Sequence, residues 1–111
     1  MTVSDLVNEL GLKGFSGKEG LDREVTGGYV SDLLSDVMGK AAEGEAWVTL
    51  QTHQNVVAIA SLKDLACIIL VSGFEPDEDS VEHSEEEGIP ILGTELPAFD
   101  ITGKLYNYIK K

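Results

Sequence analysis

The apolar run at positions 65–71 constrains the fold of this chain more than any other feature of the sequence. The run is long enough for one strand and far shorter than the roughly 20 residues of a membrane-spanning helix. A strand without polar positions must be covered on both faces, which is typical of parallel sheets between layers of helices. The run therefore predicts an α/β fold with this segment inside the sheet.

Strand and helix patterns alternate along the rest of the chain, with short connections between them. Near the N-terminus, Thr2 and Asp5 form a capping-box pattern for a short helix that Gly11 ends. We expect one domain, residues 1–111, with a parallel or mixed β-sheet flanked by helices. The other strands are predicted at 12–15, 25–30, 46–50 and 89–92, and the other helices at 32–42, 56–65, 76–88 and 98–108.

The helix expected after Thr52 is apolar on nearly every side. Positions 56–60 read Val-Val-Ala-Ile-Ala, whereas a surface helix on a sheet needs only one apolar stripe. A second copy of the chain would cover the other side, so we expect a homodimer with its interface at 56–60. Alternatively, other elements of the same chain fold over this helix. Residues 55–60 also fit a strand, but the capping pattern at Thr52 favours a helix.

The chain carries a formal net charge of −12, and many of its acids are concentrated at positions 75–87. Such a surface repels phosphate backbones and anionic membranes, so we expect no binding to nucleic acid or membranes. The acidic segment is either a solvated helix face or a docking face for a basic protein partner. The single cysteine, Cys67, lies in the apolar run, and the N-terminus lacks the features of a signal peptide. Both observations predict a cytoplasmic location.

Positions 22–30, which we call the signature segment, gather an acid, a base, a hydroxyl and two adjacent glycines. Gly27 and Gly28 permit a positive φ and the close approach of a backbone or a ligand. The Thr26 hydroxyl and exposed amides would then hold an anion, with Arg23 as its counter-charge. Alternatively, Arg23 pairs with the preceding aspartate to pin the loop, and the glycines only allow a tight bend.

A second candidate site, Thr52, His53 and Asn55, falls at the expected end of a strand and start of a helix. Ligands of open α/β sheets commonly bind at such ends, where free helix N–H groups point outward. Alternatively, the Thr52 hydroxyl caps the helix by bonding the backbone near Asn55, and His53 faces solvent. If this turn and the signature segment meet in space, they form a small pocket for a polar or anionic ligand.

The sequence contains no complete catalytic motif. The Gly17-Lys18 pair has the wrong spacing for a phosphate-binding loop, and Glu19 takes the place of the magnesium-binding hydroxyl. One exposed histidine and one buried cysteine do not make a metal site, and no nucleophile stands beside a base at a diagnostic spacing. We therefore expect no enzymatic activity, no metal and no cofactor.

The Asp-Arg and Thr-Gly-Gly residues of the signature segment resemble the signature of the DRTGG domain. Matches at 33–38, at 46–53 with Asn55, and at 87–92 follow in order, so the resemblance spans nearly the whole chain. It implies an α/β fold similar to the N-terminal domain of HPr kinase/phosphorylase. In those kinases the activity belongs to a separate C-terminal domain, so the resemblance implies no kinase activity here. DRTGG domains occur as accessory modules, often beside CBS domains in regulatory pyrophosphatases.

Two functions follow as hypotheses. The first is a non-catalytic regulatory module, a homodimer that senses a nucleotide or another small anion. The ligand-binding residues of this module would be Arg23, Thr26, Gly27, Gly28, Thr52, His53 and Asn55. The alternative is an interaction protein that docks onto an enzyme complex through its dimer surface and acidic helix.

Overall fold

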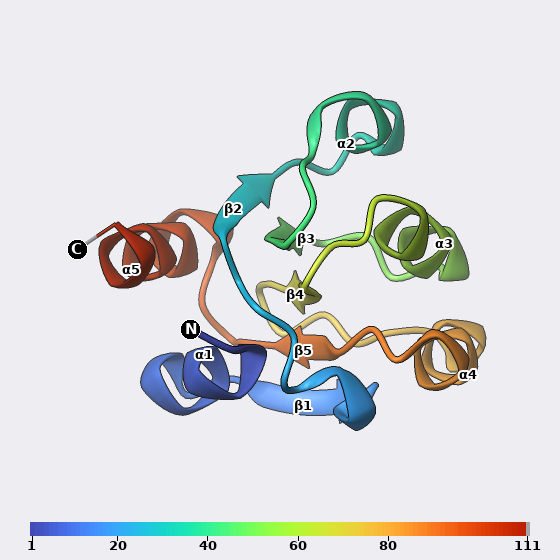
Figure 1. The fold of residues 1–111 in the computed structure, drawn as a ribbon, viewed down its shortest axis with the longest axis horizontal. Helices are drawn as coiled ribbons and strands as arrows, with labels where there is room; N and C mark the ends of the chain where they lie inside the picture. The colour runs from blue at the N-terminus through green and yellow to red at the C-terminus, as the bar shows by residue number, and fades with distance from the viewer. Residues whose placement is uncertain (111) are drawn as a thin grey trace.

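Five strands form one sheet in the order β1-β5-β4-β3-β2 in the computed structural model, which describes residues 1–110 (Figure 1). Strands β2 to β5 are parallel to one another, whereas β1, the outermost strand beside β5, runs antiparallel to β5. The sheet is therefore mixed. The strands are β1 Lys13–Ser16, β2 Gly27–Val30, β3 Glu45–Thr49, β4 Cys67–Leu70 and β5 Ile91–Gly93.

Helices cover both faces of the sheet (Figure 1). The helices α2, α3 and α4, which connect successive parallel strands, lie on one face, and α1 and α5 lie on the other. Right-handed crossovers between strands that are added in one direction place all connecting helices on the same face. The helices are α1 Val3–Leu10, α2 Leu34–Lys40, α3 Gln54–Leu62, α4 Glu78–Glu87 and α5 Ala98–Ile109, with a 3-10 turn at Lys18–Gly20.

The interior strands are buried on both faces, which confirms the inference from the apolar run. Ile68 and Leu70 of β4 join the core under α2 and α3, together with Trp47 of β3. Cys67 and Ile69 point to the opposite face and pack in the core under α1 and α5. Since side chains alternate along a strand, one apolar strand supplies both cores.

The predicted elements are present, with ends that differ by a few residues. The predicted capping box forms at the start of α1, and Gly11 ends this helix with a φ of 64°. The start of α2 is later than predicted because the Asp32 carboxylate accepts hydrogen bonds from Thr49 Oγ1 (2.8 Å) and Leu50 N (2.9 Å). The helix predicted at 76–88 begins later, at Glu78, because Asp77 is its N-cap and Pro76 lies before that cap.

The segment at 56–60 belongs to a helix, as predicted, and the same chain buries all of it except the exposed Ala58. Val56, Val57, Ile59 and Ala60 are at most 8% exposed, and α3 packs against β4 and the neighbouring helices α2 and α4. The alternative in which other elements of the chain fold over this helix is therefore confirmed. These residues give no reason to place a second copy here, and the homodimer itself stays a prediction.

Candidate functional site

The structure places the two predicted halves of the ligand site at opposite edges of the sheet. Arg23 and Thr26 lie just before β2, at the edge where the parallel strands begin, which we call the amino edge. Thr52 and His53 follow β3, at the carboxyl edge, where the parallel strands end. Because β2 and β3 are parallel, the start of one lies far from the end of the other. The shared pocket that would join the two halves does not form.

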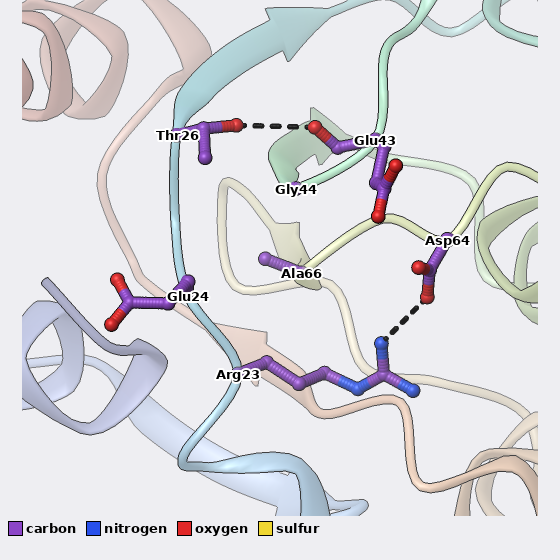
Figure 2. Close-up of a pocket in the computed structure, with 7 residues that line it drawn as sticks. All are labelled: Arg23, Glu24, Thr26, Glu43, Gly44, Asp64 and Ala66. Atoms are coloured by element: carbon purple, nitrogen blue, oxygen red, sulfur yellow. Dashed lines mark hydrogen bonds and ion pairs between the residues drawn. The ribbon is translucent and has the colours of Figure 1, made fainter.

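A cavity of about 380 Å³ opens at the amino edge beside the signature segment (Figure 2). Its walls come from the segment before β2, the turn before β3 and the turn between α3 and β4. In Figure 2, the Arg23 side chain extends along the cavity toward Asp64. The lining residues are Arg23, Glu24, Thr26, Glu43, Gly44, Asp64 and Ala66.

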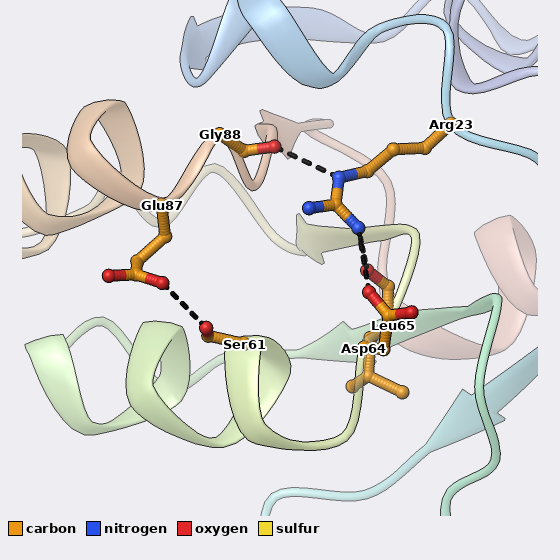
Figure 3. Close-up of polar contacts among 6 residues, drawn as sticks. All are labelled: Arg23, Ser61, Asp64, Leu65, Glu87 and Gly88. Atoms are coloured by element: carbon orange, nitrogen blue, oxygen red, sulfur yellow. Dashed lines mark hydrogen bonds and ion pairs between the residues drawn. The ribbon is translucent and has the colours of Figure 1, made fainter.

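Arg23 links three segments that are far apart in the sequence (Figure 3). Its Nε donates to the Gly88 carbonyl at 3.0 Å, just after α4 ends. Its Nη1 donates to Asp64 Oδ1 at 3.1 Å and, over a longer distance of 3.5 Å, to the Leu65 carbonyl. The guanidinium therefore holds the turn before β4 and the end of α4 against the signature segment. We call this set of contacts the Arg23 clamp. The pairing pins the loop, as the alternative predicts, but the partner is Asp64 rather than Asp22.

The Thr-Gly-Gly part of the signature segment serves packing. The Thr26 hydroxyl donates to the carbonyl of the residue before Gly44 at 3.1 Å, and its side chain fills the space beside Gly44, whose φ is 82°. Gly27 and Gly28 are residues of β2 and neither has a positive φ, so the predicted tight bend is wrong. Gly28 instead permits the close approach of α5, because a Cβ there would lie 3.0 Å from Leu105 Cδ2.

Carboxylates outnumber cations around the amino-edge cavity. Glu24, Glu43 and Asp64 line it, against the single guanidinium of Arg23. Glu24 pairs with the N-terminal amine at 3.0 Å. The Arg23 and Asp64 side chains are 30% and 60% exposed, so solvent screens their ion pair and the pair is weak enough to exchange. An anionic group would therefore reach Arg23 by taking the place of the Asp64 carboxylate.

The turn of Thr52, His53 and Asn55 is fastened to the start of α4. The Thr52 carbonyl accepts hydrogen bonds from Asp77 N at 3.1 Å and from Ser80 Oγ at 2.6 Å. His53 Nδ1 lies 3.1 Å from Asp77 Oδ2, and its largely exposed ring confirms the solvent-facing position. The N-cap of α3 is His53, without a capping bond from its side chain, so the predicted cap by Thr52 is wrong. Asn55 is exposed in the first turn.

A second cavity, of about 400 Å³, lies at the carboxyl edge of β4 and β5, and no motif marks it in the sequence. Phe74, directly after Ser72-Gly73, is the sequence signal that could have revealed this cavity. An aromatic residue in a polar loop is not expected to pack in the core, so it indicates a binding surface. Asp64 carries no such signal, because its role depends on an arginine 41 positions away.

The structure also places the single cysteine and the side chains that could bind a metal ion. Burial raises the pKa of the Cys67 thiol to about 12, so this thiol is protonated and unreactive at neutral pH. Within residues 1–110, no group of three or more His, Cys, Asp or Glu side chains is placed to hold a metal ion. Across the same described residues, no helix has the length and apolar character needed to cross a membrane.

Fold and site together define a three-layer α/β domain whose signature residues hold the amino edge of the sheet. This is the fold of a DRTGG domain. A solved structure with this fold is that of the CBS and DRTGG domains of the regulatory region of Clostridium perfringens pyrophosphatase, complexed with the activator diadenosine tetraphosphate. The match has a TM-score of 0.69 at 13% sequence identity, and it covers 94% of this chain and 45% of that chain.

A curated relative is the HPr kinase/phosphorylase of Levilactobacillus brevis. The two sequences are 25% identical over 128 aligned positions, which cover 99% of this chain and 40% of the relative. The chain thus spans less than half the length of either matched protein. No family model matches the chain. The α/β fold that the DRTGG resemblance implies is confirmed.

Proposed function

We propose that this chain is a non-catalytic regulatory module that senses a nucleotide or another small anion and acts as a cytoplasmic homodimer. The observation that carries the proposal is the Arg23–Asp64 ion pair, which lines a cavity and is partly exposed. A carboxylate on an arginine occupies the place that a ligand carboxylate or phosphate would take. The likeness to a regulatory region solved with a nucleotide activator makes nucleotides the first ligands to test.

Exchange at Arg23 would transmit ligand binding to the turn between α3 and β4. Asp64 has a φ of 55°, a left-handed conformation that costs a non-glycine residue about 1–3 kcal/mol. Its ion pair with Arg23 helps to hold this conformation. A ligand that takes over the guanidinium releases the turn, so the start of β4 is free to shift. A ligand that binds one of the two arrangements more tightly shifts the population toward it.

The substitution Asp64→Asn tests this exchange, because it removes the competing carboxylate and asparagine tolerates the left-handed conformation. In isothermal titration calorimetry with AMP, ADP and ATP, we expect Asp64→Asn to bind about tenfold more tightly than the wild type. Arg23→Lys keeps the charge but loses the forked guanidinium, so it should weaken binding.

A clamp with a purely structural role gives a different pattern in the same experiment. Both variants would then unfold at lower denaturant concentration, and neither they nor the wild type would bind a nucleotide. Equal nucleotide affinity of the wild type and Asp64→Asn would contradict the exchange. Asp100→Asn on α5 is the matched control, since it also removes one exposed carboxylate but lies outside the cavity.

The proposed ligand contacts are Arg23 and Thr26, which both line the amino-edge cavity. Gly27 and Gly28 support them by shaping β2. The turn at 52–55 is not included in the proposed contacts, because it lies at the opposite edge of the sheet.

The acidic helix α4 favours a second candidate function, docking onto a basic protein partner. Two of its acids serve the fold: Glu85 accepts a hydrogen bond from Gly17 N at 3.0 Å, and Glu87 accepts one from Ser61 Oγ at 2.7 Å (Figure 3). Glu82 and Glu86 are exposed and one turn apart, so both can face a partner. A docking role predicts that nucleotides bind neither the wild type nor Asp64→Asn.

A further inference from the structure

The chain leaves the sheet toward opposite faces after β4 and after β5. From β4 it continues to α4, and from β5 it continues to α5, which lies on the other side of the sheet (Figure 1). Loops that part in this way between adjacent parallel strands leave a crevice at the carboxyl edge, the usual ligand position in open α/β sheets. The cavity of about 400 Å³ lies at this crevice, and its volume is within the range of small-molecule sites.

The backbone around the crevice is irregular at three places. Ser72 and Gly73 are both left-handed, with φ values of 56° and 77°, and for Ser72 this conformation is strained. The pairing of β1 with β5 shifts register at Phe15, and such bulges re-aim side chains beside functional sites. The Phe15 ring lies against Gly93, where an added Cβ would overlap with it.

Backbone hydrogen bonds tie the two loops to each other. Ser72 N donates to the Leu96 carbonyl at 2.8 Å, and Gly73 N donates to the Thr94 carbonyl at 2.9 Å. The walls of the crevice are therefore set before a ligand arrives, which reduces the entropy lost on binding.

The side chains of the crevice combine two aromatic rings, one cation and two carboxylates. Phe74 is 47% exposed, and Lys13 Nζ lies 4.9 Å from the centroid of the Phe15 ring. The Glu95 carboxylate lies over Gly73, where a Cβ would be 2.8 Å from Oε1. An exposed aromatic face stacks on planar rings, and carboxylates accept hydrogen bonds from amino groups. The lining residues of the crevice include no arginine to pair with a phosphate, unlike those of the amino-edge cavity, and Glu75 and Glu95 outweigh the single lysine, so a polyphosphate would be repelled.

We propose that this crevice binds a planar heterocycle with an amino group and no polyphosphate, namely a nucleobase or a nucleoside. The ring stacks on Phe74, the amino group donates to Glu95, and Lys13 donates to a hydroxyl or carbonyl oxygen of the ligand. The site goes beyond the nucleotide sensing proposed for the amino edge. It lies at the other edge of the sheet and shares no lining residue with that cavity.

The test is calorimetric titration with adenosine, cytidine and uridine. Adenosine or cytidine should bind saturably and at least about tenfold more tightly than uridine, which lacks the amino group. Phe74→Ala should weaken this binding about tenfold, as expected for the loss of one stacking partner. Glu95→Gln should reduce the preference for cytidine over uridine.

Two control variants separate this site from other surfaces. Phe99→Ala removes an aromatic residue of α5 that is 89% exposed, and it should leave nucleoside binding unchanged. Asp100→Asn, which lies outside the crevice, should also leave it unchanged. No nucleotide is titrated here, so a failure at the amino edge does not affect this result. Phe74→Leu replaces Phe74→Ala if the latter fails to fold. The proposal is overturned if no nucleoside binds saturably, if uridine binds as tightly as adenosine and cytidine, or if the Phe74 variants bind like the wild type.

Discussion

Arg23 reaches its partners because the residue at position 20 has no side chain. A Cβ on Gly20 would overlap with the Gly88 carbonyl oxygen and would lie 2.8 Å from Pro90 Cδ. The same carbonyl accepts the hydrogen bond from Arg23 Nε. The glycine-rich connection before the signature segment is thus needed for close packing of backbone against backbone.

Replacing Gly20 with alanine should lower the free energy of unfolding by about 1–3 kcal/mol. The added methyl group meets the Gly88 carbonyl and the Pro90 ring, which cannot turn away as a flexible side chain would. Urea denaturation followed by the fluorescence of Trp47, which is fully buried, measures the change.

Gly103→Ala is the matched control and should have the opposite sign. Gly103 is an exposed residue inside α5, and a Cβ there meets no atom within 4 Å. Alanine should therefore raise the free energy of unfolding by about 0.5–1 kcal/mol. A neutral result for Gly20→Ala would show that the contact with Gly88 adapts, and our account of the clamp would be wrong.

The signature segment could be singled out from the sequence, but the roles of its residues could not. Arg23 bonds residues 41 and 65 positions away, and sequence spacing does not tell which of many acids it meets. Glycine serves either a positive φ or a close approach, and the two uses look identical in a sequence. At Gly28 the second use applies, because α5 returns to pack on β2.

Among the elements, α4 carries many acidic residues, but two buried serines attach it to the rest of the domain by hydrogen bonds. Ser84 is fully buried; its Oγ donates to the Ile89 carbonyl at 2.6 Å and accepts a hydrogen bond from Ser16 Oγ at 2.9 Å. Ser80, also fully buried, donates to the Thr52 carbonyl. Small hydroxyls on the inner face let α4 lie close to its neighbours while their hydrogen bonds are satisfied.

Ser84→Ala should therefore lower the free energy of unfolding by about 1–3 kcal/mol, because it leaves buried polar partners unsatisfied. Glu86→Ala, on the exposed face of the same helix, should change it by less than about 0.5 kcal/mol. Thermal unfolding of both variants measures the difference. Similar losses in the two variants would mean that the acidic face, too, holds the helix in place.

Local patterns were sufficient to predict the helices and strands, because apolar periodicity and capping residues lie within each element. The ends of elements depend on distant partners: Asp32 is drawn out of α2 by Thr49. The cover of α3 could not be predicted either. Its flanking helices α2 and α4 are placed by the order of the strands, which the sequence pattern does not specify.

The net charge of the whole molecule opposes self-association. Each copy carries −12, so a homodimer brings together two strongly negative bodies. Salt screens this repulsion, with a Debye length of about 10 Å at 0.1 M. We therefore expect light scattering after size exclusion to show a dimer fraction that grows with sodium chloride concentration. A monomer at every salt concentration would remove the homodimer from the proposed function.

The two cavities are joined by a single strand. Ala66 lines the cavity at the amino edge, Gly73 lines the crevice at the carboxyl edge, and β4 runs between them through the core. A strand is a stiff connection that rises about 3.3 Å per residue. If ligands at the two ends of β4 are coupled, each ligand changes the binding affinity of the other by the same factor. A domain with two coupled sites would respond to the two ligands jointly rather than to one of them alone.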